Sequence, residues 1–223
     1  MLFRSTDDEQ LDKLREFWTQ YGKTIIAGII LGLAALAAWA GWQSWQAKNQ
    51  TAAAIAFHQI EQLSAANQPK QAMEAARKLA ESDQGSVYAT LALMIGAHEA
   101  MSQNDPAKAA IYLNDAMQHA KQPSLAALAQ LRLARVQWAQ NKPEQALTTL
   151  KAKTPPKAYE SMFTELTGDI QASQKNWAAA RAAYEQVLKS PESANTMVQI
   201  KLDNLPAASV ATSAPTASGK EKS

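Results

Sequence analysis

The feature that most constrains this chain is a run of nineteen uncharged residues near its N-terminus, Thr24 to Trp42. At about 1.5 Å of rise per helical residue the run reaches roughly 28 Å, close to the thickness of the hydrocarbon core of a bilayer. In lipid, a single segment satisfies its own backbone only as a helix. We therefore predict one transmembrane helix, residues 24–42, which contains Gly28, Gly32 and Trp39.

Charges on either side of the run predict its orientation. Among the twenty residues after it the only lysine or arginine is Lys48, whereas four such residues precede it: Arg4, Lys13, Arg15 and Lys23. The more basic flank of a membrane helix stays in the cytoplasm. We expect residues 1–23 inside the cell and residues 43–223 outside it.

A cleaved signal peptide is the main alternative to an anchor, because Ala38-Trp39-Ala40 resembles a cleavage site. Two features favour a retained helix. The apolar run is longer than the roughly 7 to 15 residues of a signal peptide's apolar region, and the 23 residues before it carry five acidic groups.

The segment before the run, residues 1–23, has the pattern of an amphipathic helix. Thr6 and Glu9 fit a capping box, and an apolar stripe follows at Leu11, Leu14 and Trp18. Such a stripe contacts either membrane lipid or a cytosolic protein. Within the span, Gly28 and Gly32 form a G-x-x-x-G motif, which would allow a second helix to approach.

Composition narrows the function of the rest of the chain. Residues 43–205 carry 16 basic and 14 acidic groups, so no excess of positive charge marks a nucleic-acid surface. Cysteine is absent, so the fold in an oxidising compartment has no disulfides and depends on packing.

Breaks recur at a fixed spacing after the membrane run. The tripeptides that begin at Asn67, Asn104 and Asn141 each place Asn two residues before Pro and lie 37 residues apart, and Asn176-Trp177 continues the series. Proline suits the first position of a helix, so each break predicts the start of the second helix of a pair. Four helix-turn-helix units result.

Small residues keep the same register in every unit. Alanine occupies the equivalent position in each unit. The residue one helical turn later is larger than alanine in every unit except the first. This arrangement lets paired helices approach closely. The equivalent alanines are Ala72, Ala109, Ala146 and Ala180, and the residues one turn later are Ala76, Leu113, Leu150 and Tyr184. The pattern is that of tetratricopeptide repeats, and it is clearest in the last unit, where Gly168, Trp177, Ala180, Tyr184 and Pro191 follow the usual order.

We therefore predict an all-α chain: a single N-terminal transmembrane helix followed by a tetratricopeptide-like α-solenoid over residues 43–205. Its first helices are expected near 47–66, 86–103, 124–140 and 157–174, and its second helices near 69–82, 106–121, 143–152 and 177–189. A last helix near 192–204 should close the stack through Met197, Ile200 and Leu205. Residues 206–223 lack apolar periodicity and are expected to be a disordered tail.

Catalytic chemistry finds no support in the sequence. The histidines His58, His98 and His119 are scattered, and no nucleophile, phosphate-loop or metalloprotease motif occurs. Glu160, Glu165 and Asp169 are best explained as a solvated helical face. We predict no catalytic residue, no metal site and no cofactor.

Stacked helix pairs form a concave surface that suits peptides or domains of other proteins. On the first helices of the third and fourth units we expect a partner groove with polar residues at Arg132, Arg135, Gln137 and Gln171, although the two arginines are also explained as solvated residues. Trp138 is expected in the core between repeats.

The chain resembles the ancillary SecYEG translocon subunit family of the Gram-negative inner membrane. Segments that carry the resemblance are LDKLREFWTQYGKTIIAGIILG, LRLARVQWAQNKPEQALTTL, GDIQASQKNWAAARAAYEQVL and MVQIKLDNL. It implies a periplasmic repeat domain on one membrane helix, accessory to the SecYEG translocon and paired with a PpiD-like periplasmic chaperone. It also implies that the cytoplasmic tip restrains a stress-response regulator of the Rcs type.

The resulting prediction is a non-enzymatic docking module that helps chaperones receive secretory proteins. Two alternatives remain open at this point: a periplasmic scaffold for envelope or cell-wall assembly, and a membrane-tethered signalling regulator that acts through residues 1–23.

Overall fold

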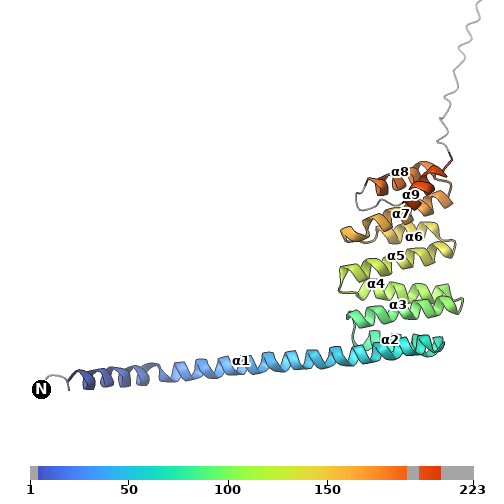
Figure 1. The fold of residues 1–223 in the computed structure, drawn as a ribbon. Coiled ribbons are helices and arrows are strands. Elements are labelled where there is room, and N and C mark those ends of the chain that lie inside the picture. The colour runs from blue at the N-terminus through green and yellow to red at the C-terminus, as the bar shows by residue number, and fades with distance from the viewer. Residues whose placement is uncertain (1–4, 190–195, 207–223) are drawn as a thin grey trace, which may run out of the picture. The chain divides into compact units, whose positions relative to one another are not determined.

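The computed structural model describes residues 5–189 and 196–206, and every regular element within these ranges is a helix (Figure 1). Contacts divide the chain into two units, Met1–Ala52 and Ala53–Ser223. The predicted all-α fold is confirmed.

Helix α1 extends from Ser5 to Ala65, so it begins one residue before the predicted start at Thr6. Its apolar stretch long enough to cross a membrane is Ile26–Ser44, two residues further along the chain than predicted. Side chains of this stretch are exposed, including Trp39 and Trp42, and none is buried in a core. A stretch of this kind is found in signal sequences as well as in anchors. A Cβ atom added at Gly28 or Gly32 would meet nothing within 4 Å, so helix pairing through these glycines stays a prediction.

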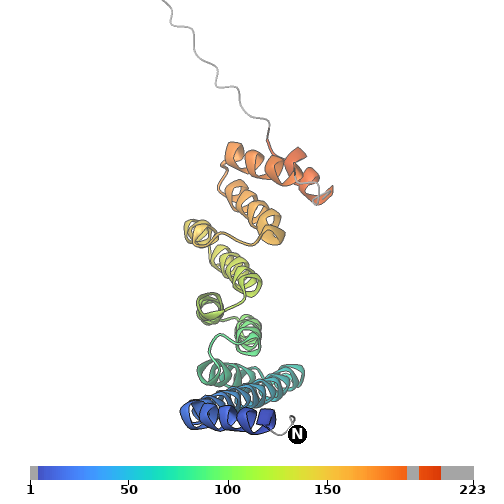
Figure 2. The ribbon, with the colours of Figure 1, turned by 90° about the vertical axis from the view of Figure 1, so that its left-hand side faces the viewer.

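The second unit is a stack of short helices that begins with the last residues of α1. In Figure 2 the helices of residues 87–173 alternate between two columns. Their bounds are α2 Pro69–Ser82, α3 Val87–Ser102, α4 Pro106–His119, α5 Pro123–Ala139, α6 Pro143–Lys151, α7 Lys157–Ser173, α8 Trp177–Leu188 and α9 Thr196–Asp203. The predicted helices agree with α2 to α8 closely. The first predicted helix, residues 47–66, is continuous with the membrane-length stretch and forms the end of α1 at Ala65.

Each turn between paired helices has the same backbone geometry. At the third break, the N–H of Asn141 donates to the carbonyl of Trp138 at 2.8 Å, and the N–H of Lys142 donates to that of Gln137 at 3.0 Å. This is a Schellman motif, which requires a left-handed residue after the helix. The left-handed residues are Asn67, Asn104, Asn141 and Lys175, with φ between 54° and 63°. The recurring asparagine therefore ends the first helix, while the following proline begins the second.

The alanines that the repeat pattern places in register are buried in the stack. Ala72, Ala109, Ala146 and Ala180 are fully buried. Tyr184 is buried as well, and Trp177, which takes the place of proline at the start of α8, is half-buried. A Cβ atom at Gly168 would lie 2.6 Å from Tyr184 Cε1, so only glycine fits there. These contacts join the buried apolar residues into clusters that follow one another along the stack.

Helix α9 covers the apolar end of the stack, but not through all the residues predicted. Val198 is fully buried, and Leu202 and Leu205 pack against the buried cluster that contains Val198, Tyr184 and Val187. The prediction was wrong for Met197 and Ile200, which are exposed. Val198 and Leu202 are four residues apart and so share the covered face of the helix, whereas Met197 and Ile200 do not lie on it. Residues 190–195, which contain the predicted Pro191, and the predicted tail beyond Pro206 lie outside the described residues.

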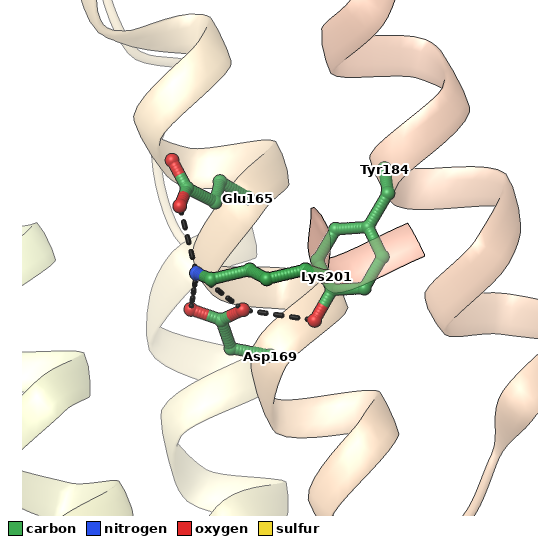
Figure 3. A network of polar contacts seen from close by, with 4 residues as sticks. All are labelled: Glu165, Asp169, Tyr184 and Lys201. Atoms are coloured by element: carbon green, nitrogen blue, oxygen red, sulfur yellow. Dashed lines mark hydrogen bonds and ion pairs between the residues drawn. The ribbon is translucent and has the colours of Figure 1, made fainter. Parts of the chain in front are cut away.

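A polar cluster fastens α9 to α7 (Figure 3). Lys201 Nζ lies 2.7 Å from Glu165 Oε1 and 2.8 Å from both oxygens of Asp169, and the Tyr184 hydroxyl donates to Asp169 Oδ1 at 2.9 Å. The prediction that Glu165 and Asp169 form a solvated face was therefore wrong, because both carboxylates are half-buried and paired. The cluster holds the cap in place.

Burial lowers the pKa of Lys201, but its hydrogen bonds to Asp169 and Glu165 outweigh this effect and raise the pKa above the ordinary 10.5. Burial and the hydrogen bond to Asp169 raise the pKa of Tyr184 well above the ordinary 10.0. Both groups thus hold their protons more tightly in the folded protein than in the unfolded chain.

The turn geometry predicts that Asn141→Ala lowers the free energy of unfolding by about 1 kcal/mol, because alanine tolerates the left-handed conformation less well than asparagine. A matched control is Asn114→Ala on the exposed face of α4, where alanine is the better helix former and stability should rise by about 0.5 kcal/mol. Urea denaturation followed by circular dichroism measures both. A loss of similar size in the two variants would contradict the assignment.

The cap cluster predicts alkaline sensitivity. Because the pKa values of Lys201 and Tyr184 are raised on folding, their stabilising contribution is complete below about pH 10 and is lost as the pH rises through the folded values, by up to about 1.4 kcal/mol per pH unit for each group. Lys201→Met should cost about 1–2 kcal/mol at neutral pH and flatten this alkaline decline. Denaturation at several pH values tests the effect. The exposed Lys78→Met should leave the decline as steep as in the unaltered chain.

Candidate partner-binding groove

A groove of about 620 Å³ lies on the face of the stack formed by the first helices of the first three units. Its walls come from the end of α1, from α3 and from α5, with Leu113 of α4 beneath them. Both arginines that the sequence analysis predicted for a partner groove, Arg132 and Arg135, line it. The volume is in the range of sites that take a small ligand or a few side chains of a partner.

Each of the three helices contributes a stripe at helical spacing. The stripe of α3 contains Leu91, Met94, Ile95, His98 and Met101, which follow the i, i+3, i+4, i+7, i+10 spacing of one helical face. Equivalent stripes are Phe57, Glu61 and Ser64 on α1, and Leu128, Arg132, Arg135 and Val136 on α5. The same face of each first helix therefore points into the groove.

The groove has an apolar floor and a polar rim. Met94, Ala97 and Leu113 are buried at its base, while Met101 is 42% exposed. The side chains of Arg132 and Arg135 are exposed on the α5 wall. An apolar centre with a charged rim is the usual anatomy of a protein-interaction surface.

Two other residues predicted for this groove lie elsewhere. Gln137 is buried, and its amide oxygen accepts a hydrogen bond from Thr149 Oγ1 at 2.7 Å. The prediction was wrong here because Gln137 is two residues beyond Arg135 and so faces the second helix of its own unit. Gln171 of α7 accepts a hydrogen bond from Asn176 at 2.9 Å and does not line the groove.

Trp138, which we expected between repeats, is half-buried against the cluster of α5, α6 and α7. Its indole N–H donates to Ser173 Oγ on α7 at 3.1 Å. The residue therefore joins the third and fourth units.

The sequence did not lead us to the groove stripes of α1 and α3. Helix α3 is apolar almost all the way around, since its buried residues include Ala89, Leu93 and Ala100 as well as the groove base. Its periodicity therefore does not distinguish the groove face from the core faces. The signal that was available in the sequence is His98, a polar residue in register with the apolar residues of the same stripe.

One hydrogen bond fixes the α1 wall against α3. The hydroxyl of Ser64 donates to Glu99 Oε1 at 2.5 Å, and Glu99 is only 5% exposed. A carboxyl group removed from water in this way is stabilised by its hydrogen-bond donor. The contact holds two of the three walls in register.

Among the residues that the structure describes, no three His, Asp or Glu side chains gather as ligands for a metal ion. His58 Nδ1 lies 3.3 Å from Glu61 Oε2. His119 Nδ1 lies 3.0 Å from the carbonyl oxygen of Asp115, four residues earlier in α4. His98 is at the groove rim.

A stack of helix pairs with buried alanines, left-handed turns and a groove along its first helices defines a repeat protein of the tetratricopeptide class. The family described as tetratricopeptide repeat-like domain matches residues 15–207, and the chain belongs to this family.

Curated relatives support the resemblance stated from the sequence. A protein of Haemophilus influenzae named ancillary SecYEG translocon subunit is 28% identical over 207 residues, which cover 92% of this chain and 100% of the relative. The protein of the same name from Escherichia coli is 28% identical over 89% of this chain and 96% of its own length. The crystal structure of MamA matches with a TM-score of 0.47 at 15% identity, over 60% of this chain and 74% of that one. The resemblance to the translocon subunit family is confirmed.

The hydrogen bond between Ser64 and Glu99 predicts that Ser64→Ala lowers the free energy of unfolding by about 1–2 kcal/mol. The substitution leaves a buried carboxyl oxygen of Glu99 without its donor. Ser124→Ala, at an exposed position early in α5, is the matched control and should change stability by less than about 0.5 kcal/mol. Thermal denaturation followed by circular dichroism compares the two. Equal stability of both variants would mean that the hydrogen bond does not support the wall.

Proposed function

We propose that this chain is an accessory subunit of the Sec protein-export translocon, in which the repeat stack is a docking module for other proteins. The observation that carries the proposal is the alignment with named translocon subunits over nearly the full length of both chains, so that it includes the membrane-length stretch of α1 as well as the stack. The groove on the first helices supplies a surface suited to binding rather than to catalysis.

A membrane anchor would keep the docking module close to the channel. We infer that α1 is a retained single-pass anchor in the inner membrane, with residues 1–23 in the cytoplasm and the domain of residues 43–205 in the periplasm. Four basic residues before the apolar run against Lys48 after it support this orientation. Tethering keeps the stack at high local concentration beside the channel, so weak individual contacts suffice.

The resemblance also implies more specific partners. A PpiD-like periplasmic chaperone is the proposed partner of the stack, and emerging secretory proteins are its proposed clients. Residues 1–23 are proposed to restrain a regulator of the Rcs type. The exposed aromatic residues Phe17, Trp18 and Tyr21 give that segment a surface for either membrane lipid or such a regulator.

Purification of the full chain from membranes in mild detergent tests the proposal. Channel subunits of the translocon should co-purify, and a chain in which an unrelated membrane helix replaces residues 24–44 shows whether the anchor contributes to the association. Recovery of cell-wall enzymes without any channel subunit would favour the envelope scaffold. If a chain without residues 53–206 keeps full activity in cells, the signalling alternative is correct.

Orientation is tested by reporter fusions. Alkaline phosphatase without its own signal peptide, which is active only outside the cytoplasm, should be active when fused after Pro206 and inactive when fused before Met1 of the full chain. Green fluorescent protein fused at the same two positions should give the opposite pattern. Phosphatase activity at Met1 but not at Pro206 would reverse the proposed topology.

A further inference from the structure

The charges at the rim of the groove are unevenly distributed. Arg132 and Arg135 stand on the α5 wall, three residues apart and so on the same face of the helix. Neither guanidinium has an ion-pair or hydrogen-bond partner anywhere in residues 15–189 or 196–206 whose side chains the structure describes. On the opposite wall Glu61 is engaged with His58 at 3.3 Å.

Two unpaired arginines beside an apolar floor are well placed to bind carboxylates. Neighbouring like charges on a helix repel each other, and a bound anion removes this repulsion. A guanidinium presents a planar set of donors that matches a carboxylate, and the attraction grows when an apolar segment covers the floor and excludes water. The α5 wall thus favours acidic side chains at the edge of an apolar ligand.

We propose that the groove binds a peptide segment of a partner protein that combines apolar side chains with at least two carboxylates facing α5. The inference rests on the docking function proposed above and specifies the chemistry of the partner. Apolar side chains fill the floor between Leu91, Met94 and Leu128, while the carboxylates pair with Arg132 and Arg135.

The chain's own C-terminus is less suitable as the occupant. Residues 207–223 contain a single acidic residue, Glu221, which lies between Lys220 and Lys222, and their only large apolar residue is Val210. Such a segment provides neither the carboxylates nor the apolar side chains that the groove fits. Charge complementarity therefore favours a segment from another protein.

A pair of synthetic peptides tests the proposal. The first carries leucines at positions i, i+3, i+4 and i+7 with glutamates between them, and the second replaces every glutamate with lysine. Fluorescence anisotropy measures their binding to the full chain in phosphatidylcholine nanodiscs, with empty nanodiscs as the blank. The glutamate peptide should bind on the order of tenfold more tightly, and its advantage should shrink as salt is added.

Charge variants of Arg132 and Arg135 test whether the preference for the glutamate peptide comes from the α5 wall. The double variant R132E/R135E should reverse the preference, whereas R132K/R135K keeps the positive charge and should retain it with reduced strength. The variant K70E/K78E makes the same change in net charge on the exposed face of α2, outside the groove, and should leave the preference unchanged. Circular dichroism confirms that each variant is folded.

Equal binding of the two peptides, or a preference that R132E/R135E does not alter, would overturn the proposal. So would tighter binding of a synthetic peptide of residues 207–223 than of the glutamate peptide. The purification described above separates this outcome from failure of the proposed function: channel subunits that co-purify with a chain lacking peptide selectivity leave the translocon role intact, and selectivity without co-purification overturns only that role.

Discussion

Close approach of paired helices at small residues is the contact on which the rest of the structure depends. Ala72, Ala109, Ala146 and Ala180 have no exposed surface, so a larger side chain at any of these positions would force its helix pair apart. A second helix covers only one face of the first helix with which it is paired. One face of α1, α3 and α5 remains uncovered, and that face is the groove.

The left-handed turns make this packing repeatable. A Schellman motif reverses the chain within a few residues, and the proline that follows in the first three units begins the next helix at once. In the fourth unit lysine replaces asparagine and tryptophan replaces proline, yet the same two backbone hydrogen bonds form. Tertiary packing therefore imposes the turn where the local sequence no longer favours it.

The helix bounds and the buried alanines were predictable from recurring patterns in the sequence. Hydrogen bonds and ion pairs between residues far apart in the chain were not. Helix bounds followed from the recurring Asn and Pro, and the buried alanines followed from their register. The bond from Ser64 to Glu99 and the cluster of Lys201 with Asp169 join residues more than thirty positions apart, and no local pattern indicates them. Gln137 was placed wrongly because polarity indicated exposure, whereas a neighbouring Thr149 allows the amide to be buried.

The apolar, polar-rimmed groove and the proposed anchor are consistent with each other. A groove that buries only a few apolar side chains and pairs two exposed arginines gives a modest affinity, since exposed ion pairs contribute little and ordering a peptide opposes binding. For a freely diffusing protein such affinity would rarely be useful. The proposed tether beside the channel would supply an effective concentration in the millimolar range, about the level at which weak, rapidly reversible contacts are occupied. Rapid release would suit the proposed transfer of successive clients to a chaperone, and tight binding would hinder it.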